Sequence, residues 1–265
     1  MSLRADSHGC SSDGRVSGLS RTDEMEANRI LALVSGANRG IGLAIAAGLA
    51  RRGANVLLGC RDFGRGEAAC AALQKEGLNI RPAQLDTTDD ASVSALATLI
   101  AQDYGRLDVL INNAGIGLDH DASLSMAERA RRTLEVNVVG PIRLTEAMTP
   151  LLASSERARI VNVSSELSSF GLRSKPDWIY ADFAMPTYQA SKAALNSLTL
   201  SYARLLKDKG IKVNAICPGY TATEATNFMS SRTPDQAAVI AMRFALLEDN
   251  GPTGVFVNEA GELPW

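Results

Sequence analysis

The stretch from Leu31 to Gly53, LALVSGANRGIGLAIAAGLARRG, constrains the fold of this chain most strongly. Its first four residues are apolar, as in a strand that is buried on both faces of a parallel sheet. Three glycines follow, and then an alanine-rich segment whose larger apolar residues lie near one helical face. Gly53 lies where a helix C-terminal glycine is common. A strand, a glycine turn and a helix together present backbone N–H groups and a helix dipole to an anion such as a pyrophosphate.

The glycine spacing, Gly36-x-x-x-Gly40-x-Gly42, differs from the G-x-G-x-x-G pattern of many dinucleotide-binding proteins. By itself it also fits a tight strand-to-helix turn without a ligand, because glycine serves any sharp turn. Residues further along the chain are therefore needed to distinguish a nucleotide site from a turn without a ligand.

The composition argues against several functional classes. With 46% hydrophobic and 21% charged residues, the chain is typical of a soluble globular protein, and its net charge of -2 favours neither nucleic acid nor an anionic membrane as a partner. No apolar run is long enough to span a bilayer. The four cysteines form no C-x-x-C pair and no cluster with histidine, so we expect no metal site and a cytoplasmic protein with reduced thiols. Of the two histidines, only His120 lies outside the N-terminal extension, and it is a poor lone candidate for a Ser-His triad.

Strand-like and helix-like segments alternate from residue 30 onward, which predicts an α/β fold with a Rossmann-like, doubly wound parallel sheet and helices on both faces. Residues 1–28 lack an apolar core and are predicted to be a disordered extension, and residues 29–265 a single domain. After the second strand, a helix is expected to end near residue 76. Four more helices are expected at about 89–103, 123–152, 187–209 and 234–248, with Gly140-Pro141 bending the second of these. Seven strands are expected, at about 31–34, 55–60, 80–85, 107–111, 159–163, 211–217 and 254–258.

Small and polar residues follow most of these strands. They are Cys60-Arg61, Asp86, the NNAG motif at 112–115, the serine pair at 164–165, and Pro218-Gly219. Ligands of open α/β sheets bind outside the carboxyl ends of the strands. We therefore expect these residues to line one edge of the sheet, together with the glycine turn.

The residues after the second strand bear on the choice of cofactor. A conventional NAD site has an acidic residue there to bind the ribose 2′-hydroxyl, whereas this chain has Cys60 and then Arg61. Arg39, in the glycine turn, can flank the same place. Guanidinium groups suit a phosphate, so the pattern favours the 2′-phosphate of NADP(H) over NAD(H). Two exposed surface arginines are the alternative, and Asp62 could also pair with Arg61.

Tyr188 and Lys192 are four residues apart, which places both side chains on one face of a helix. A free tyrosine has a pKa near ~10. A nearby ammonium group favours the phenolate and lowers that pKa, which brings the phenol closer to what acid–base catalysis requires. In a reduction, Tyr188 would donate its proton to a carbonyl oxygen as a hydride arrives.

Two other side chains could belong to the same site. Ser165, at the end of the fifth strand, could hydrogen-bond the reacting oxygen beside Tyr188, although Ser164 is an alternative and both could be ordinary strand-end residues. Asn137 lies within a predicted helix, where asparagine is a middling choice unless something uses it. It could hold a water in a proton path, or it could only mark local solvation or a kink near Pro141.

Together these residues resemble the short-chain dehydrogenase/reductase family over about residues 28–258, and within it the NADPH-dependent carbonyl reductases. The matching motifs are SGANRGIG, NNAG, IVNVSS, Y-x-x-x-K and CPGYTAT. The resemblance implies that Asn137, Ser165, Tyr188 and Lys192 are catalytic, with Lys192 also bound to the nicotinamide ribose and Asn137 in a proton relay. It implies that the NADP(H) site comprises Gly36, Asn38, Arg39, Gly40, Ile41, Gly42, Arg61, Asp86, Thr87, Asn113, Ala114, Gly115, Tyr188, Lys192, Pro218, Gly219, Thr221 and Thr223.

The function implied is that of an NADP(H)-dependent oxidoreductase acting on a carbonyl or secondary alcohol. Tyr188 follows Ser165 by 23 residues, which is longer than the family's usual spacing and indicates an insertion between them. With this insertion the oligomeric state stays open between a monomer and a homo-oligomer. Apolar residues in the insertion and after Pro218-Gly219 could line a pocket for a lipophilic substrate or could only pack those loops down. They are Trp178, Tyr180, Phe183, Met185, Tyr220, Phe228 and Met229.

Two other functional classes compete with this interpretation. A regulatory protein could bind NADP(H) without significant turnover, although such a protein has no need of the acid–base pair Tyr188 and Lys192. An epimerase or dehydratase is a third possibility, but the region after the sixth strand is short for the substrate domain that those enzymes usually have.

Overall fold

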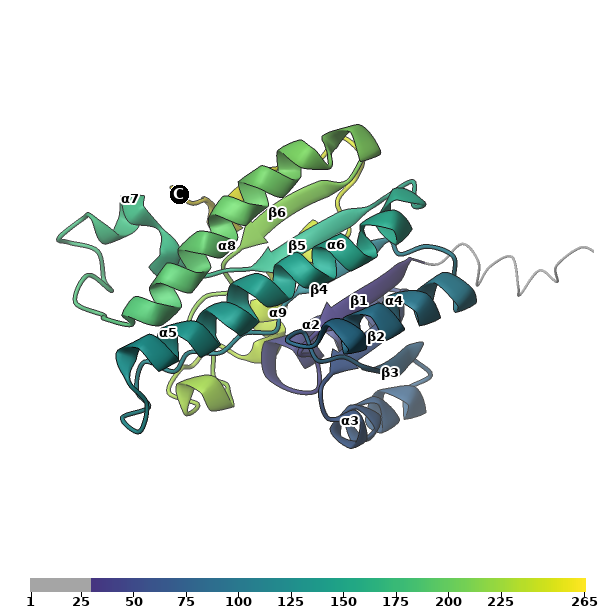
Figure 1. Ribbon diagram of the computed structural model, residues 1–265, viewed down its shortest axis with the longest axis horizontal. Coiled ribbons are helices and arrows are strands. Elements are labelled where there is room, and N and C mark those ends of the chain that lie inside the picture. Colours follow the sequence, from purple (N-terminus) through teal and green to yellow (C-terminus); the bar gives the residue numbers. More distant parts are fainter. Residues whose placement is uncertain (1–29) are drawn as a thin grey trace, which may run out of the picture.

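The computed structural model describes residues 30–265, so the extension predicted at residues 1–28 lies outside the described residues. The described chain contains an eight-stranded sheet in the order β3-β2-β1-β4-β5-β6-β7-β8 (Figure 1). All neighbouring strands are parallel except β7 and β8. The strands are β1 (Leu31–Ser35), β2 (Asn55–Cys60), β3 (Ile80–Gln84), β4 (Val109–Asn112), β5 (Arg159–Val163), β6 (Lys212–Ile216), β7 (Phe256–Asn258) and β8 (Gly261–Glu262).

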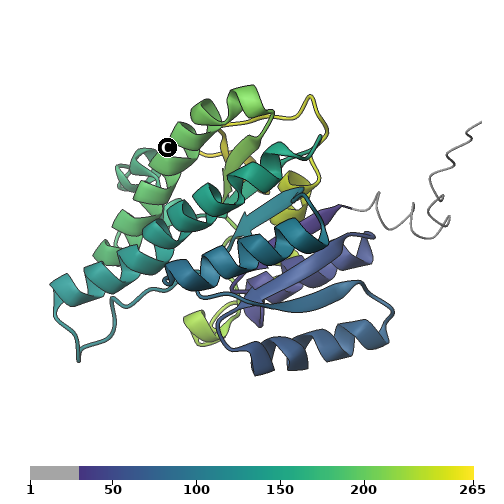
Figure 2. The ribbon, with the colours of Figure 1, turned by 45° about the vertical axis from the view of Figure 1, so that its right-hand side comes forward.

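Helices cover both faces of the sheet. On one face α4, α6 and α8 lie side by side, and Figure 2 shows the same layer after a 45° turn. On the other face lie α2, α3 and α9. The helices are α2 (Gly40–Arg51), α3 (Phe63–Lys75), α4 (Asp90–Asp103), α5 (Met126–Leu134), α6 (Gly140–Ala153), α7 (Phe170–Arg173), α8 (Pro186–Leu205) and α9 (Pro234–Ala245).

Strand β1 shows why its sequence is apolar throughout. Successive strand residues point to opposite faces, so Ala32 and Val34 pack in the core on the α2 side, while Leu31 and Leu33 pack in the core on the α4 side. Every residue of β1 is buried. The continuous apolar run is therefore the signature of a central strand with a helical layer on each face, and the predicted Rossmann-like fold is confirmed.

Beyond small shifts in the bounds of elements, and a 3-10 turn, Lys207–Lys209, at the end of the helix expected at 187–209, the structure differs from the sequence prediction as follows. The helix expected at 123–152 contains a π-helical turn, Glu135–Val139, between α5 and α6, and Pro141 lies at the start of α6, where a missing N–H is tolerated. The loop expected before Tyr188 contains a 3-10 turn, Glu166–Ser168, and the short helix α7. Strand β8 was not predicted, because two residues are too few to show a periodic pattern.

The strand order places a topological switch point at the carboxyl end of β1. Strand β1 pairs with both β2 and β4, so the chain connections leave it in opposite directions. Such a switch point is where open α/β sheets bind their ligands. None of the helices in residues 30–265 is long and apolar enough to cross a membrane.

Candidate active site

The turn between β1 and α2 has no room for a side chain at two of its three glycines, Gly36 and Gly42. A Cβ atom on Gly42 would lie 2.4 Å from Nδ2 of Asn113 and 2.5 Å from the carbonyl oxygen of Gly36. A Cβ atom on Gly36 would lie 2.9 Å from Cα of Ala114. Gly36 and Gly40 also have φ angles of 63° and 55°, which residues other than glycine rarely adopt. Close packing at Gly36 and Gly42, and positive φ angles at Gly36 and Gly40, thus account for the three glycines of this turn.

The NNAG segment after β4 holds the glycine turn in place. The hydroxyl of Ser35 accepts hydrogen bonds from the backbone N–H groups of Asn113 and Ala114, each at 3.0 Å, and donates to the carbonyl of Ile111 at 3.2 Å. The side-chain amide of Asn113 donates to the carbonyls of Ser35 and Gly36 at 2.9 and 3.1 Å. These bonds join the turn and the β4 loop into one unit at the switch point.

Helix α2 begins at this turn with its first backbone N–H groups available. Its N-cap residue, Arg39, makes no side-chain capping bond, and the first turn contains no acidic residue. The first N–H groups of a helix have no intrahelical acceptor, and the dipole favours an anion beside them. Together with the glycine cradle, this donor set fits the pyrophosphate of a dinucleotide.

The two arginines expected to select the cofactor have different partners. Asp62 caps α3 through the N–H of Arg65, at 3.1 Å, and its carboxylate also forms an ion pair with the Arg65 guanidinium, so the alternative pairing with Arg61 does not occur. Within residues 30–265 the exposed side chain of Arg61 has no ion pair or hydrogen bond. Arg39 forms an ion pair with Glu224 in the loop after β6. Arg61 is therefore the arginine with an uncommitted guanidinium.

Tyr188 and Lys192 lie one turn apart in the first half of α8. The ammonium nitrogen of Lys192 is 5.7 Å from the centroid of the Tyr188 ring and donates to the carbonyl of Val163, in β5, at 2.7 Å. The Lys192 side chain is buried, and burial lowers the pKa of its ammonium group to about 8. A buried lysine of α8, hydrogen-bonded to the end of β5, is thus held beside the phenol of Tyr188.

The pKa of Tyr188 moves in the direction opposite to the one expected from its lysine neighbour. Burial raises the pKa of the phenol to about 12, and the Cys217 thiol adds to this, while hydrogen bonding with Ser165 lowers it. Desolvation of the phenolate is the largest of these effects, so the proximity of Lys192 does not decide the direction. The protein groups therefore hold Tyr188 as a neutral phenol, which is the form that can donate a proton.

The two serines at the end of β5 have different surroundings. The hydroxyl of Ser164 is buried and donates to the side chain of Asn196 in α8 at 2.6 Å. The hydroxyl of Ser165 accepts from the N–H of Leu167 at 3.2 Å and is also a hydrogen-bond neighbour of Tyr188. Of the two alternatives, Ser165 is the one that lies beside Tyr188.

Asn137 lies in the π-helical turn and is fully buried. Its amide nitrogen donates to the Ile116 carbonyl at 2.8 Å and to the Ser191 hydroxyl at 2.9 Å, and its oxygen accepts from the Ile116 N–H at 2.8 Å. Its oxygen and the Lys192 nitrogen would each lie 3.3 Å from a Cβ atom on Gly115, so both groups face the same small space. Asn137 thus joins the β4 loop to α8, and the helix widens where it does so.

The other expected cofactor residues lie at the same edge of the sheet. The loop after β6 closes on the glycine turn, because a Cβ atom on Gly40 would lie 3.4 Å from the methyl group of Thr223. Asn38 and Ile41 belong to the glycine turn and the first turn of α2. The residues that follow β3 and β6 are Asp86, Thr87, Pro218, Gly219, Thr221 and Thr223.

Sequence reasoning missed Asp119, which lies in the loop after β4. Its carboxylate accepts hydrogen bonds from the N–H and the hydroxyl of Thr187, both at 2.9 Å, and from the N–H of Tyr188 at 3.1 Å. The sequence does indicate that the helix needs a cap from elsewhere, because neither Met185 nor Pro186 has a side chain that can cap it. The sequence does not say which distant residue supplies the cap.

The apolar residues expected to line a substrate pocket are largely exposed. The side chains of Phe183, Tyr220, Phe228 and Met229 are 42%, 45%, 65% and 69% exposed. Trp178 and Tyr180 pack edge to face, with ring centroids 5.3 Å apart. Met185, the last of the expected residues, packs against Gly117, and Gly117 also lies against the Tyr188 ring. These four side chains thus present apolar surface to the solvent.

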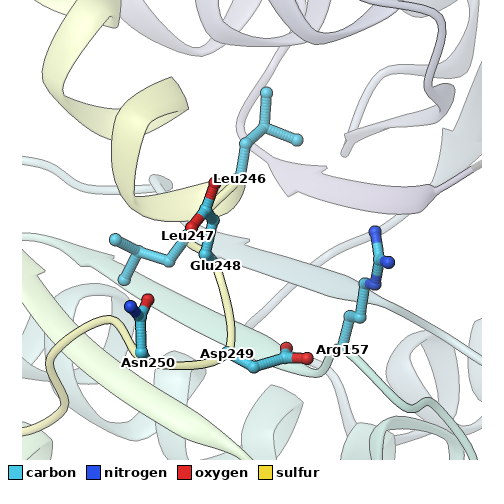
Figure 3. A pocket seen from close by; sticks show the side chains of 6 residues that line it. All are labelled: Arg157, Leu246, Leu247, Glu248, Asp249 and Asn250. Carbon is cyan, nitrogen blue, oxygen red and sulfur yellow. The ribbon is translucent and has the colours of Figure 1, made fainter.

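A pocket of about 510 Å³ lies away from these residues. It is lined by Arg157, which precedes β5, and by residues 246–250 after α9 (Figure 3). Its lining includes none of the catalytic residues expected from the sequence. Because β5 begins near this pocket and ends at Ser164 and Ser165, the pocket lies at the opposite edge of the sheet from the candidate site.

Comparisons with known proteins agree with the motifs. A family model described as short chain dehydrogenase matches residues 31–234. Short-chain dehydrogenase/reductase 1 of Saponaria officinalis is 34% identical, with 90% of this chain and 97% of that protein aligned. The NADPH carbonyl reductase 1 of Sus scrofa is 32% identical, with 91% and 96% aligned. The crystal structure of an NADPH-bound carbonyl reductase from chicken fatty liver matches with a TM-score of 0.78 at 27% identity, over 89% of this chain and 100% of that one.

Proposed function

Because the chain belongs to the short-chain dehydrogenase/reductase family and is an oxidoreductase, we propose that it transfers a hydride between NADP(H) and a carbonyl compound or the corresponding secondary alcohol. Bound NADPH would supply the hydride for reduction. The glycine turn and the uncapped start of α2 would hold the pyrophosphate of the cofactor. Arg61 would bind its 2′-phosphate. The NADPH-dependent relatives support this choice of cofactor.

In the proposed reduction, Tyr188 donates its phenolic proton to the carbonyl oxygen as the hydride reaches the carbonyl carbon, and the product is the alcohol. Ser165 hydrogen-bonds the same oxygen and keeps it beside the phenol. Lys192 binds the nicotinamide ribose and, with Asn137, lines the path by which the proton on Tyr188 is replaced. The observation that carries this proposal is the convergence of these four side chains beside the glycine turn.

A panel of ketones, aldehydes and secondary alcohols tests the proposal, with consumption of NADPH or formation of NADPH from NADP as the measurement. We expect turnover with carbonyl compounds, and more with apolar ones, because Phe183, Tyr220, Phe228 and Met229 present apolar surface. NADPH binding without turnover across the panel would instead favour a regulatory NADP(H)-binding protein.

We also propose a cytoplasmic location, which the free, buried thiols of Cys60, Cys70 and Cys217 support.

The Arg61→Ala variant tests the choice of cofactor. We expect the KM for NADPH to rise by roughly 10- to 150-fold, because a hydrogen bond to a charged group contributes about 1.5–3 kcal/mol. The KM for NADH, which has no 2′-phosphate, should hardly change. Arg65→Ala is the matched control, since Arg65 is a nearby exposed arginine that already pairs with Asp62. Equal losses for NADPH and NADH in Arg61→Ala would contradict the assignment.

The pH profile of carbonyl reduction tests the role of Lys192. With a pKa of about 8, its ammonium group is charged below that pH and neutral above it. The Tyr188 phenol, with a pKa of about 12, stays protonated over the same range. We therefore expect kcat/KM to be flat at neutral pH and to fall as the pH rises through about 8. The residual activity of Lys192→Arg should lack this fall, because a guanidinium stays charged. A wild-type rate that rises through this range would contradict the proposal.

A further inference from the structure

The catalytic helix α8 begins without a cap of its own. Its N-cap residue, Met185, makes no side-chain hydrogen bond, and Pro186 occupies the first position of the helix. The N–H groups of Thr187 and Tyr188 belong to the first turn, where no intrahelical acceptor is available. Tyr188 therefore lies in the part of α8 that depends most on an external partner.

Asp119 supplies that partner from a different part of the chain. One carboxylate oxygen accepts from the Thr187 N–H, and the other accepts from the Thr187 hydroxyl and the Tyr188 N–H. A carboxylate at a helix N-terminus also interacts favourably with the helix dipole. The contact joins residues 68 and 69 positions apart, so α8 is capped through the tertiary fold.

The loop that carries Asp119 is itself held on its other side. Two hydrogen bonds between Asn137 and Ile116 fix the start of the segment at residues 116–119. A Cβ atom on Gly117 would lie 3.3 Å from the Tyr188 ring, so the middle of the segment lies against the phenol. Arg129, in α5, donates to the Asp119 carbonyl at 2.9 Å. The segment is thus a short strut between the π-helical turn and the backbone of Tyr188.

We propose that Asp119 is a positioning residue for Tyr188. It acts through the backbone of the first turn of α8 and sets where the phenol lies relative to Ser165 and the β4 loop. This inference rests on the proposed function, because it assumes that Tyr188 is the proton donor. A misplacement of about 1 Å at a reacting group costs roughly 100-fold in rate, so loss of the cap is expected to affect the chemical step.

The test compares Asp119→Ala and Asp119→Asn with the control Asp121→Asn. Asp121 is two residues further along the loop, and its carboxylate bonds only to Ser123 within the described residues. For an apolar ketone reduced with NADPH, we expect kcat to fall by roughly 100-fold in Asp119→Ala and by less in Asp119→Asn, which keeps one acceptor oxygen. The dissociation constant for NADPH should not change, and the kinetic isotope effect with deuterated NADPH should increase as hydride transfer becomes rate-limiting.

Three results would overturn the proposal. One is a kcat in Asp119→Ala equal to that of Asp121→Asn. Another is a loss of NADPH affinity that matches the loss in kcat, which would mean that the whole β4 loop had collapsed. If Asp119→Ala does not fold, an Asp119→Asn variant with wild-type kcat and isotope effect has the same meaning. Absence of turnover in the wild-type enzyme would count against the proposed function rather than against the role of Asp119.

Discussion

Replacing Tyr188 with phenylalanine is expected to lower kcat for carbonyl reduction by about 100- to 10,000-fold, the range that general acid catalysis contributes. The substitution removes only the phenolic hydroxyl. The ring contacts with the β4 loop at Gly117 are kept, so the fold and NADPH binding should hardly change. Initial rates with a carbonyl substrate and fluorescence titration with NADPH measure the two quantities separately.

The control for this experiment is Tyr202→Phe. Tyr202 is in the same helix, α8, but packs against the hydrophobic core between α8 and the sheet, away from Ser165 and Lys192. We expect that variant to retain wild-type kcat. A Tyr188→Phe enzyme as active as Tyr202→Phe would show that another group donates the proton.

Gly42→Ala is expected to have the largest effect on the cofactor cradle. The new methyl group would lie 2.4 Å from Nδ2 of Asn113 and 2.5 Å from the Gly36 carbonyl oxygen, and the carbonyl belongs to the backbone and cannot rotate away. Overpacking of this kind costs about 1–3 kcal/mol of unfolding free energy. NADPH binding should be lost as well, because the turn has to open to admit the methyl group.

Gly64→Ala is the matched control for Gly42→Ala. A Cβ atom on Gly64, in α3, would meet only a carboxylate oxygen of Asp62 at an ordinary 3.6 Å. Alanine there should leave NADPH binding unchanged and raise stability by about 0.4–1 kcal/mol. Denaturant unfolding and NADPH titration of both variants provide the comparison. A Gly42→Ala protein that binds NADPH like Gly64→Ala would contradict the cradle.

The parts of this protein that could be predicted from sequence are those that local patterns encode. The apolar run of β1 and the glycines after it predict a buried strand and a close turn. The structure contains both: every residue of β1 is buried, and the turn has no space for a Cβ atom at Gly42. The strand-end positions of Asn113 and Ser165 follow from the alternation of strands and helices.

The features that could not be predicted depend on contacts between distant residues or on burial. The π-helical turn at Asn137 adds one residue to a helical turn, which a search for helical periodicity does not detect. The ion pair of Arg39 with Glu224 and the cap that Asp119 provides for α8 each join segments that only the fold brings together. The raised pKa of Tyr188 follows from desolvation, whereas the sequence shows only the neighbouring Lys192.

The transfer of isotope from labelled NADPH tests the central claim most directly. The enzyme is incubated with an apolar ketone and NADPH that carries deuterium at the transferable position of the nicotinamide, and the product is analysed by mass spectrometry and NMR. The proposed reaction predicts an alcohol with one deuterium on the former carbonyl carbon for each NADPH consumed. Unlabelled alcohol, or NADPH that binds while the ketone is recovered unchanged, would contradict hydride transfer at the site of Tyr188.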